Sequence, residues 1–414
     1  MTNNKRQQGV SRRRFLGTAT AAAAAAAIVP RHVLGERADR RPPSETITYG
    51  VIGNGGRKDS GLRGKKDFER IAVCDVDIKR IGGEPDGKTR FTDYRKMLER
   101  KEIDVVCIGT PPHWHALPCL HAAQAGKDIF CEKPFTKFIS EGRAVADAVK
   151  RYGVIFQIGT FGRFGKQSEG DRQNRKIIKY GLIKDLSDLV ASGGGKNRTG
   201  SPSLPRVDEI PEELDYDLWL GPAPFKPYNP KRVHYSNRFY WDYEGGDLTN
   251  FGHHSMDPLL YLYGKDHTAP VRVEPGPAPW PQHPDCVGQY SWIECTYADG
   301  MRVLFGGGAY KASYDRPRKR SKVSVDDLDE EGRKRYDALP DVAKLVDFGT
   351  AVRTRQQSGG HAEASHRVST LMNLCNLAVR LNRTIHFDPD KEVIVDDEEA
   401  ARFVDIPMRA PWHL

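Results

Sequence analysis

Between residues 47 and 159, short apolar runs alternate with helical patterns, and this alternation limits the possible folds more than any other feature of the chain. The strand candidates are residues 47–52, 71–74, 104–108, 129–131 and 154–158. The helical patterns are residues 92–100, 113–125 and 140–152. Thr92 is the expected N-cap of the first helix, and Gly126 should end the second. Strands this apolar, separated by single helices, form a parallel sheet covered on both faces, so the sequence predicts a doubly wound α/β fold here.

The pattern changes beyond residue 159, where longer polar stretches and aromatic-rich loops appear. Two alternating strands, residues 290–297 and 301–305, are joined by Ala298-Asp299-Gly300, and Asp-Gly between such runs indicates a hairpin. Helices at residues 249–263 and 366–381 flank them. We expect three parts: a leader and linker over residues 1–43, the α/β domain over 44–159, and an α+β domain with a largely antiparallel sheet over 160–414.

The leader resembles a twin-arginine export signal. Residues 11–17 read Ser-Arg-Arg-Arg-Phe-Leu-Gly, and an alanine-rich apolar run follows over residues 19–29. The run is shorter than the roughly 20 residues that span a bilayer, so an anchor is not expected. Cleavage after Gly35 would leave an exported, periplasmic protein that had used the twin-arginine export machinery. The alternative is an alanine-rich helix of the mature domain.

The charge of the chain is concentrated in this leader. Residues 1–43 carry +7 of the total net charge of +9, so the remainder is almost neutral and no nucleic-acid partner is expected. The seven cysteines are an odd number without a Cys-x-x-Cys pair, and most lie in apolar runs. They are expected to be buried thiols, with neither a disulfide framework nor a metal cluster.

A glycine-rich turn follows the first predicted strand. Gly53, Gly55 and Gly56 allow a tight turn and close approach of the backbone to a pyrophosphate, although Lys58 stands where the dinucleotide fingerprint has its third glycine. Taken alone, a Gly-x-Gly turn is weak evidence, because any tight turn can use it.

An acidic residue stands where a dinucleotide site needs one. Asp75 ends the second predicted strand, 22 residues after Gly53, where it would accept hydrogen bonds from both adenosine ribose hydroxyls and repel a 2′-phosphate. NAD is therefore the expected cofactor. NADP is the alternative cofactor, since the guanidinium of Arg57 could bind its 2′-phosphate. The other interpretation of Asp75 is a turn residue after a strand.

Two further loops leave the carboxyl ends of predicted parallel strands, the edge at which such sheets bind ligands. The first contains Thr110, Pro111 and His115, and the second contains Glu132, Lys133 and Pro134. A lysine beside a cationic nicotinamide has its pKa lowered by like charge and desolvation, which suits it to proton transfer near neutral pH. The alternative is a solvated loop lysine.

From residue 45 to 414 the chain resembles the glucose-fructose oxidoreductase, inositol dehydrogenase and MocA (Gfo/Idh/MocA) family. The resemblance is carried by an ordered set of motifs: Gly53-x-Gly55, Asp75, Thr110-Pro111 with His115, and Glu132-Lys133-Pro134. It implies a Rossmann domain that binds the nicotinamide cofactor through these residues. It also implies that Lys133 lies at the nicotinamide and the substrate hydroxyl, and that the protein forms a homo-oligomer.

The family's second motif is an Asp-x-x-x-His pair on a helix after a glycine pair. Here residues 245–257 contain Gly245-Gly246, Asn250 in the aspartate position, and His254 on the histidine. Asn250 can hydrogen-bond a substrate but cannot act as a base, which leaves Lys133 and His254 as the expected catalytic residues. One alternative is that His253 and His254 only pack within the helix. Another is a metal site formed by the two histidines with Asp257, but adjacent helical histidines point apart, so we expect no metal.

Three more residues could contact a polyhydroxylated ligand: Arg163, Arg238 and Trp241. Each could equally belong to the interface between the domains. The resulting hypothesis is reversible hydride transfer between a sugar or polyol carbinol and tightly bound NAD or NADP, because an exported enzyme must keep its cofactor. Two alternatives stay open: a glycosidase or lyase that oxidises its sugar transiently, and an inactive exported protein that binds a nucleotide or sugar.

Overall fold

The computed structural model describes residues 46–414 except 57–58, 60, 161, 165–167, 184, 188–189, 194–199, 202–203, 206, 208, 278–281, 307–313 and 317–322. The predicted export signal, Arg57 and Lys58 lie outside the described residues. Residues Thr48–Leu414 form one unit, which contains both sheets described below.

The first sheet is six-stranded, in the order β3-β2-β1-β4-β5-β6. Its strands are β1 (Ile47–Ile52), β2 (Phe68–Cys74), β3 (Arg90–Phe91), β4 (Val105–Ile108), β5 (Asp128–Glu132) and β6 (Phe156–Gly159). The pairs β1–β4, β2–β3, β4–β5 and β5–β6 are parallel. The doubly wound α/β prediction is confirmed, and the strand order reverses between β1 and β4, which opens a ligand crevice at their carboxyl ends.

The helices of this layer are α2 (Ile78–Ile81), α3 (Tyr94–Leu98), α4 (Pro112–Gln124) and α5 (Ile139–Tyr152). Gly126 has a φ of 68° just beyond the α4 C-cap, as expected. The N-cap prediction for α3 was wrong by one residue. Asp93 caps the helix, because its carboxylate accepts a hydrogen bond from Arg95 N at 2.9 Å. Strand β3 was not predicted, since two residues are too short to show a period.

The second sheet has the order β12-β11-β8-β9-β10-β7. Its strands are β7 (Val190–Gly193), β8 (Arg272–Pro275), β9 (Trp292–Thr296), β10 (Arg302–Gly306), β11 (Ile385–Asp388) and β12 (Val393–Ile394). All pairs are antiparallel except β10–β7. The predicted hairpin is β9–β10, in which Gly300 has a φ of 83°. The expected largely antiparallel sheet is therefore confirmed.

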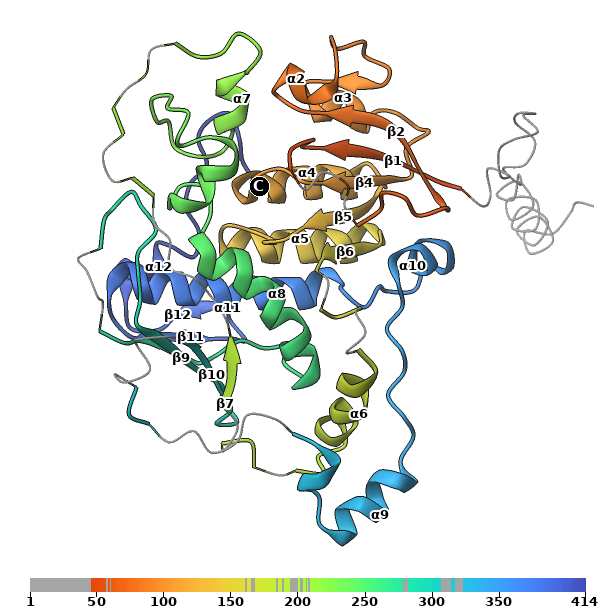
Figure 1. Ribbon diagram of the computed structural model, residues 1–414, viewed down its shortest axis with the longest axis vertical. Helices are drawn as coiled ribbons and strands as arrows, with labels where there is room; N and C mark the ends of the chain where they lie inside the picture. Colours follow the sequence, from red (N-terminus) through yellow and green to blue (C-terminus); the bar gives the residue numbers. More distant parts are fainter. Residues whose placement is uncertain are drawn as a thin grey trace, which may run out of the picture. The chain divides into compact units, whose positions relative to one another are not determined.

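Two long helices, α8 (Gly246–Leu262) and α11 (Ala362–Leu381), lie between the sheets (Figure 1). Helix α11 contacts α5 of the first layer, α8 beside it and β8 of the second sheet. On α8, Leu248, Met256 and Leu260 belong to the apolar core formed with the second sheet. These residues are spaced by eight and then four positions, which puts them near one face of the helix and leaves another face of α8 for the first domain.

The remaining elements are shorter and connect these layers. They are α6 (Ser168–Lys179), α7 (Tyr216–Leu220), the 3₁₀ turn η2 (His234–Phe239), the 3₁₀ turn η4 (Val325–Asp327), α9 (Glu330–Ala338), α10 (Phe348–Thr354) and α12 (Glu398–Ala401).

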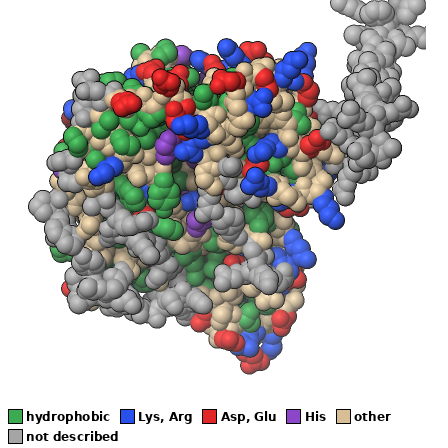
Figure 2. All heavy atoms as spheres, turned by 45° about the horizontal axis from the view of Figure 1, so that its top comes forward, with side chains coloured by type: hydrophobic (Ala, Val, Ile, Leu, Met, Phe, Trp, Pro, Cys, Tyr) green, Lys and Arg blue, Asp and Glu red, His purple; other side chains and the backbone are tan. Residues whose placement is uncertain are grey.

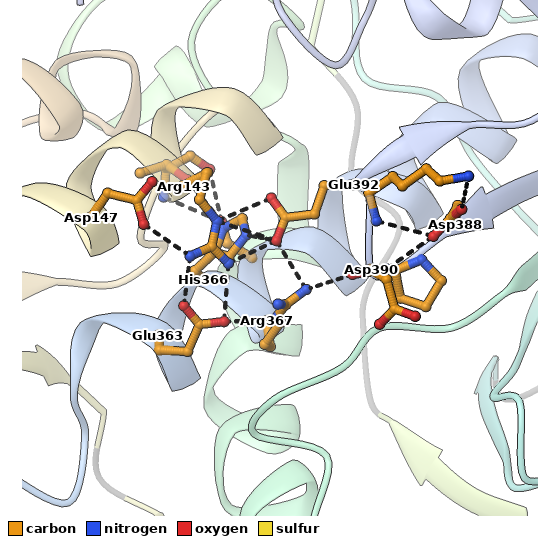
Figure 3. Close-up of polar contacts among 12 residues, drawn as sticks. Arg143, Asp147, Glu363, His366, Arg367, Asp388, Asp390 and Glu392 are labelled. Carbon is orange, nitrogen blue, oxygen red and sulfur yellow. Dashed lines mark hydrogen bonds and ion pairs between the residues drawn. The ribbon is translucent and has the colours of Figure 1, made fainter. Parts of the chain in front are cut away.

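An ionic network ties the two layers together (Figure 3). Arg143 of α5 donates to Glu363 of α11 at 2.8 Å and to Glu392, beside β12, at 2.7 Å. Buried His366 of α11 lies with Nε2 3.0 Å from Glu392. Burial raises the pKa of Glu392, but hydrogen bonds from His366 and Arg143 outweigh it and lower the pKa to about 2. The layers are thus held by charges as well as by apolar contacts.

The seven cysteines are all buried with free thiols, which confirms their expected packing role. On the face drawn in Figure 2, basic and acidic side chains are interspersed among hydrophobic ones. Within the described residues, no helix combines the length and the apolar character that crossing a bilayer requires.

Candidate active site

A cavity of about 580 Å³ lies at the carboxyl edge of the first sheet, where η2 and the first turns of α8 close it. Among its lining residues are ten of the predicted site residues: Gly53, Gly55, Gly56, Asp75, Thr110, Pro111, Glu132, Lys133, Arg238 and Asn250. Four predicted residues are not among them: His115, Arg163, Trp241 and His254. Arg57 lies outside the described residues.

Gly53 is the glycine that the turn after β1 requires. Its φ is 84°, and a Cβ added there would lie 2.6 Å from Thr110 N. Gly53 N donates to Cys74 O at 2.8 Å, which joins the turn to the end of β2. At Gly56 a Cβ would meet nothing within 4 Å. The glycine turn therefore lets β1 and the loop after β4 approach closely beneath the cavity, as a pyrophosphate cradle needs.

Asp75 lies at the end of β2 with its carboxylate at the cavity. Its two oxygens accept hydrogen bonds from Asn54 N at 2.7 Å and Asp77 N at 3.0 Å. Burial raises the pKa of Asp75, while these backbone bonds oppose the rise. Each oxygen keeps a second lone pair, so the carboxylate can accept from ribose hydroxyls. The glycine turn and this acid together fit the adenosine end of NAD.

Lys133 and Asn250 bring the two domains together at the other end of the cavity. Lys133 Nζ donates to both the backbone oxygen and the side-chain oxygen of Asn250, each at 3.0 Å. Both residues are buried. The glycine pair before Asn250 lets the start of α8 lie close to α11, because a Cβ at Gly245 would lie 1.8 Å from Asn376 Nδ2. The predicted neighbourhood of Lys133 and Asn250 is thus present in the structure.

Glu244 completes this group and was missed by sequence reasoning. Its side chain lines the cavity, is only 3% exposed, and accepts a 2.8 Å hydrogen bond at Oε1 from Asn250 Nδ2. Burial raises the pKa of Glu244, partly offset by Arg238, Asn250 and Lys133. The available signal was an acid directly before the glycine pair at positions 245 and 246.

His115 supports the site from behind. Its Nε2 lies 2.7 Å from Thr110 O, and its Nδ1 lies 2.7 Å from Pro134 O. Burial lowers the pKa of His115, and the facing carbonyl oxygens oppose this fall. The imidazole therefore joins the loops after β4 and β5, and it positions the loop that carries Lys133.

The histidines of α8 differ in their surroundings. His254 is half-buried, whereas His253 is completely buried. Burial and the charge of Lys133 lower the pKa of His253 well below its ordinary value, so this ring is neutral. The structure thus brings His253 under the direct electrostatic influence of Lys133.

Arg163 is saturated by protein partners away from the cavity. Its guanidinium pairs with Asp257 at 2.8 Å and Asp266 at 3.1 Å, and donates to Gly359 O at 3.1 Å. This placement favours the interface interpretation of Arg163 over substrate binding. Trp241 is buried with its ring under Arg380, while Arg238 does line the cavity.

Within the described residues, no group of three His, Cys, Asp or Glu side chains is placed to hold a metal ion.

The sheet order, the glycine turn and the acid at the end of β2 are those of a dinucleotide-binding domain. Residues 47–160 match the family model described as "Oxidoreductase family, NAD-binding Rossmann fold", and residues 186–414 match "Oxidoreductase family, C-terminal alpha/beta domain". The second match covers more than half of the chain. The protein therefore belongs to the Gfo/Idh/MocA oxidoreductase family and carries its NAD-binding domain.

Relatives within the family have several activities. The chain is 28% identical to an inositol 2-dehydrogenase from Salmonella paratyphi B over 188 residues, 42% of this chain and 54% of the relative. It is 28% identical to a 2,7-anhydro-N-acetylneuraminate hydratase from Mediterraneibacter gnavus over 169 residues, 40% of this chain and 44% of that protein. It spans about half the length of the curated relatives that it matches.

Among solved structures, the WlbA dehydrogenase from Bordetella pertussis, in complex with NADH and UDP-GlcNAcA, has a TM-score of 0.53. It is 16% identical, and the match covers 83% of this chain and 99% of that one. At this identity the likeness shows a shared fold.

Proposed function

We propose that the protein transfers a hydride between a hydroxyl-bearing carbon of a sugar or polyol and tightly bound NAD. The observation that carries this proposal is the meeting of Lys133 and Asn250 in the same cavity as the glycine turn and Asp75. Family membership and the polyol named in the inositol dehydrogenase relative support it. The cofactor, when bound, supplies the hydride acceptor, and the protein supplies alignment and electrostatics.

In this proposal Lys133 holds the oxygen of the reacting hydroxyl and assists the departure of its proton. Asn250 orients Nζ through two hydrogen bonds, and His115 fixes the loop from behind. His254 is the second proton handler that the motif predicts, although its position outside the cavity lining supports it less than Lys133. A buried site of this kind also excludes water from the transfer.

The test starts with the nucleotide that the purified protein carries. Denaturation should release NAD, or NADP, identifiable by mass, and myo-inositol or glucose should reduce the bound cofactor, seen as nicotinamide absorbance. Finding no nucleotide, with no binding of added NAD or NADP, would refute the proposal. Asp75→Ser should weaken NAD binding by about 10- to 100-fold, because charge-assisted hydrogen bonds to the ribose are lost.

A second candidate is redox-assisted cleavage or addition, in which the oxidised sugar eliminates a group and the hydride then returns. The hydratase among the relatives favours it, because that name describes no net oxidation. Substrate turnover without net nicotinamide reduction would establish this reaction. An inactive binding protein, the third possibility, would show no hydride exchange at all.

We further propose export by the twin-arginine route, on the strength of residues 11–29. Replacing Arg12 and Arg13 with lysine in the full-length chain should retain the protein in the cytoplasm, while the unaltered chain reaches the periplasm. Equal periplasmic recovery of both would contradict the proposal.

A further inference from the structure

We propose that Glu244 is a catalytic carboxylate of this site and takes the proton of the reacting hydroxyl, in place of an acid at position 250. The inference rests on the proposed hydride transfer and goes beyond it, because the family motif contains no residue at position 244. Three observations carry it: the position of Glu244 in the cavity, its bond to Asn250, and the chemistry that Asn250 lacks.

The first observation is that a ligand in the cavity can reach the carboxylate of Glu244. Glu244 and Lys133 both line the cavity, on either side of Asn250. Within the described residues, the carboxylate of Glu244 makes one hydrogen bond, the 2.8 Å bond that Oε1 accepts from Asn250 Nδ2. Oε2 is therefore available to a ligand.

The second observation is that Asn250 bridges the two charged groups. Its side-chain oxygen accepts from Lys133 Nζ and its amide nitrogen donates to Glu244. An amide cannot take a proton, but its two ends impose a fixed arrangement on an ammonium and a carboxylate. The acid missing from position 250 is thus supplied from six residues earlier, within reach of the same lysine.

The third observation is the electrostatic setting. The charged groups around Glu244 are Lys133 from the loop after β5, Arg238 from η2, Asp247 from α8, and Lys137. Burial raises the pKa of the carboxylate, which brings it closer to the pH at which it must accept and return a proton. A carboxylate with a purely structural role would not need an open oxygen in the cavity.

The proposed reaction combines a proton transfer with a hydride transfer. The substrate O–H bond breaks and its proton passes to Glu244 Oε2, while Lys133 donates a hydrogen bond to the same oxygen. The C–H bond breaks with its electron pair, which passes as hydride to bound NAD⁺. The carbinol is oxidised to a carbonyl and NAD⁺ is reduced. The reverse reaction returns the proton from Glu244.

The experiment compares Glu244→Gln with the swap Glu244→Gln/Asn250→Asp in the holoenzyme. Removing the carboxylate should lower kcat for myo-inositol or glucose oxidation by about 100-fold or more, with unchanged NAD content and melting temperature. It should also abolish the fall of kcat/KM on the acid side, because Gln cannot be protonated there. The swap returns an acid to position 250 and should recover at least tenfold.

The outcomes separate this inference from the proposed function. Wild-type protein that holds NAD but reduces none of it with any polyol or aldose tested refutes the proposed function. Wild-type activity that Glu244→Gln retains within threefold, with the same pH profile, overturns the role of Glu244 alone. A swap variant no more active than Glu244→Gln would likewise overturn the claim that Glu244 replaces an acid at position 250. Asp217→Asn, an exposed carboxylate of α7, is the matched control.

Discussion

Lys133 Nζ donates to two oxygens of Asn250, one from the backbone and one from the side chain, each at 3.0 Å. Lys133 directly follows strand β5 of the NAD-binding domain, and Asn250 lies on helix α8, which packs against the second sheet. The contact spans 117 positions of the sequence. Both side chains are buried and line the cavity, so this contact joins the two domains at one end of it.

Replacing Lys133 with Met should abolish most hydride transfer while NAD remains bound. Met keeps much of the side-chain volume but cannot hold the hydroxyl oxygen, so kcat should fall by about 10²- to 10⁴-fold. Single-turnover reduction of bound NAD measures the effect. Lys150→Met, an exposed lysine of α5, is the control and should leave the rate unchanged. Equal loss in both variants would contradict a specific role for Lys133.

Gly53→Ala should impair both stability and NAD binding, whereas Gly64→Ala should impair stability alone. Both glycines have positive φ, 84° and 76°. A Cβ at Gly64 meets nothing within 4 Å, so that variant should cost about 1–2 kcal/mol of backbone strain. At Gly53 the clash with the Thr110 backbone adds to this strain. Denaturant unfolding and nucleotide content measure the two effects, and equal values for both variants would be inconsistent with the clash.

Arg163→Met should destabilise the fold by about 3–5 kcal/mol, because it leaves Asp257 and Asp266 buried without their partner. If Arg163 instead bound substrate, KM would rise with little change in unfolding free energy. Chemical denaturation distinguishes the two roles. Arg383→Met, on an exposed ion pair with Asp397, should cost less than about 1 kcal/mol and serves as the comparison.

Glu392→Gln should remove part of the acid sensitivity of the fold. The native pKa of Glu392 is about 2, below its ordinary value of 4.5, so its stabilisation is present above pH 4.5 and is lost as the pH falls towards 2. The wild-type protein should be the more stable at neutral pH, and the difference should disappear near pH 2. Unfolding at a series of pH values measures this convergence. Glu398→Gln, an exposed acid of α12, should show no such trend.

Much of the NAD-binding domain could be predicted from local sequence. Periodicity located strands such as β1 to the residue, and the motifs after β1, β2, β4 and β5 had to meet at one edge because parallel strands share their carboxyl ends. The N-cap of α3 was misplaced, since Thr92 and Asp93 are both good caps and only the backbone conformation chooses between them.

What the tertiary structure decided is which long-range partners these side chains meet. Arg163 and Arg238 look alike in sequence, yet one is saturated by Asp257 and Asp266 while the other lines the cavity. Glu244 gave no periodic signal, because its role comes from a bond across a glycine pair and from burial by distant segments. The sequence by itself determined the sheet and the order of the motifs, since these follow from local periodicity. The contact of Lys133 with Asn250 required the packing of α8 against the first domain.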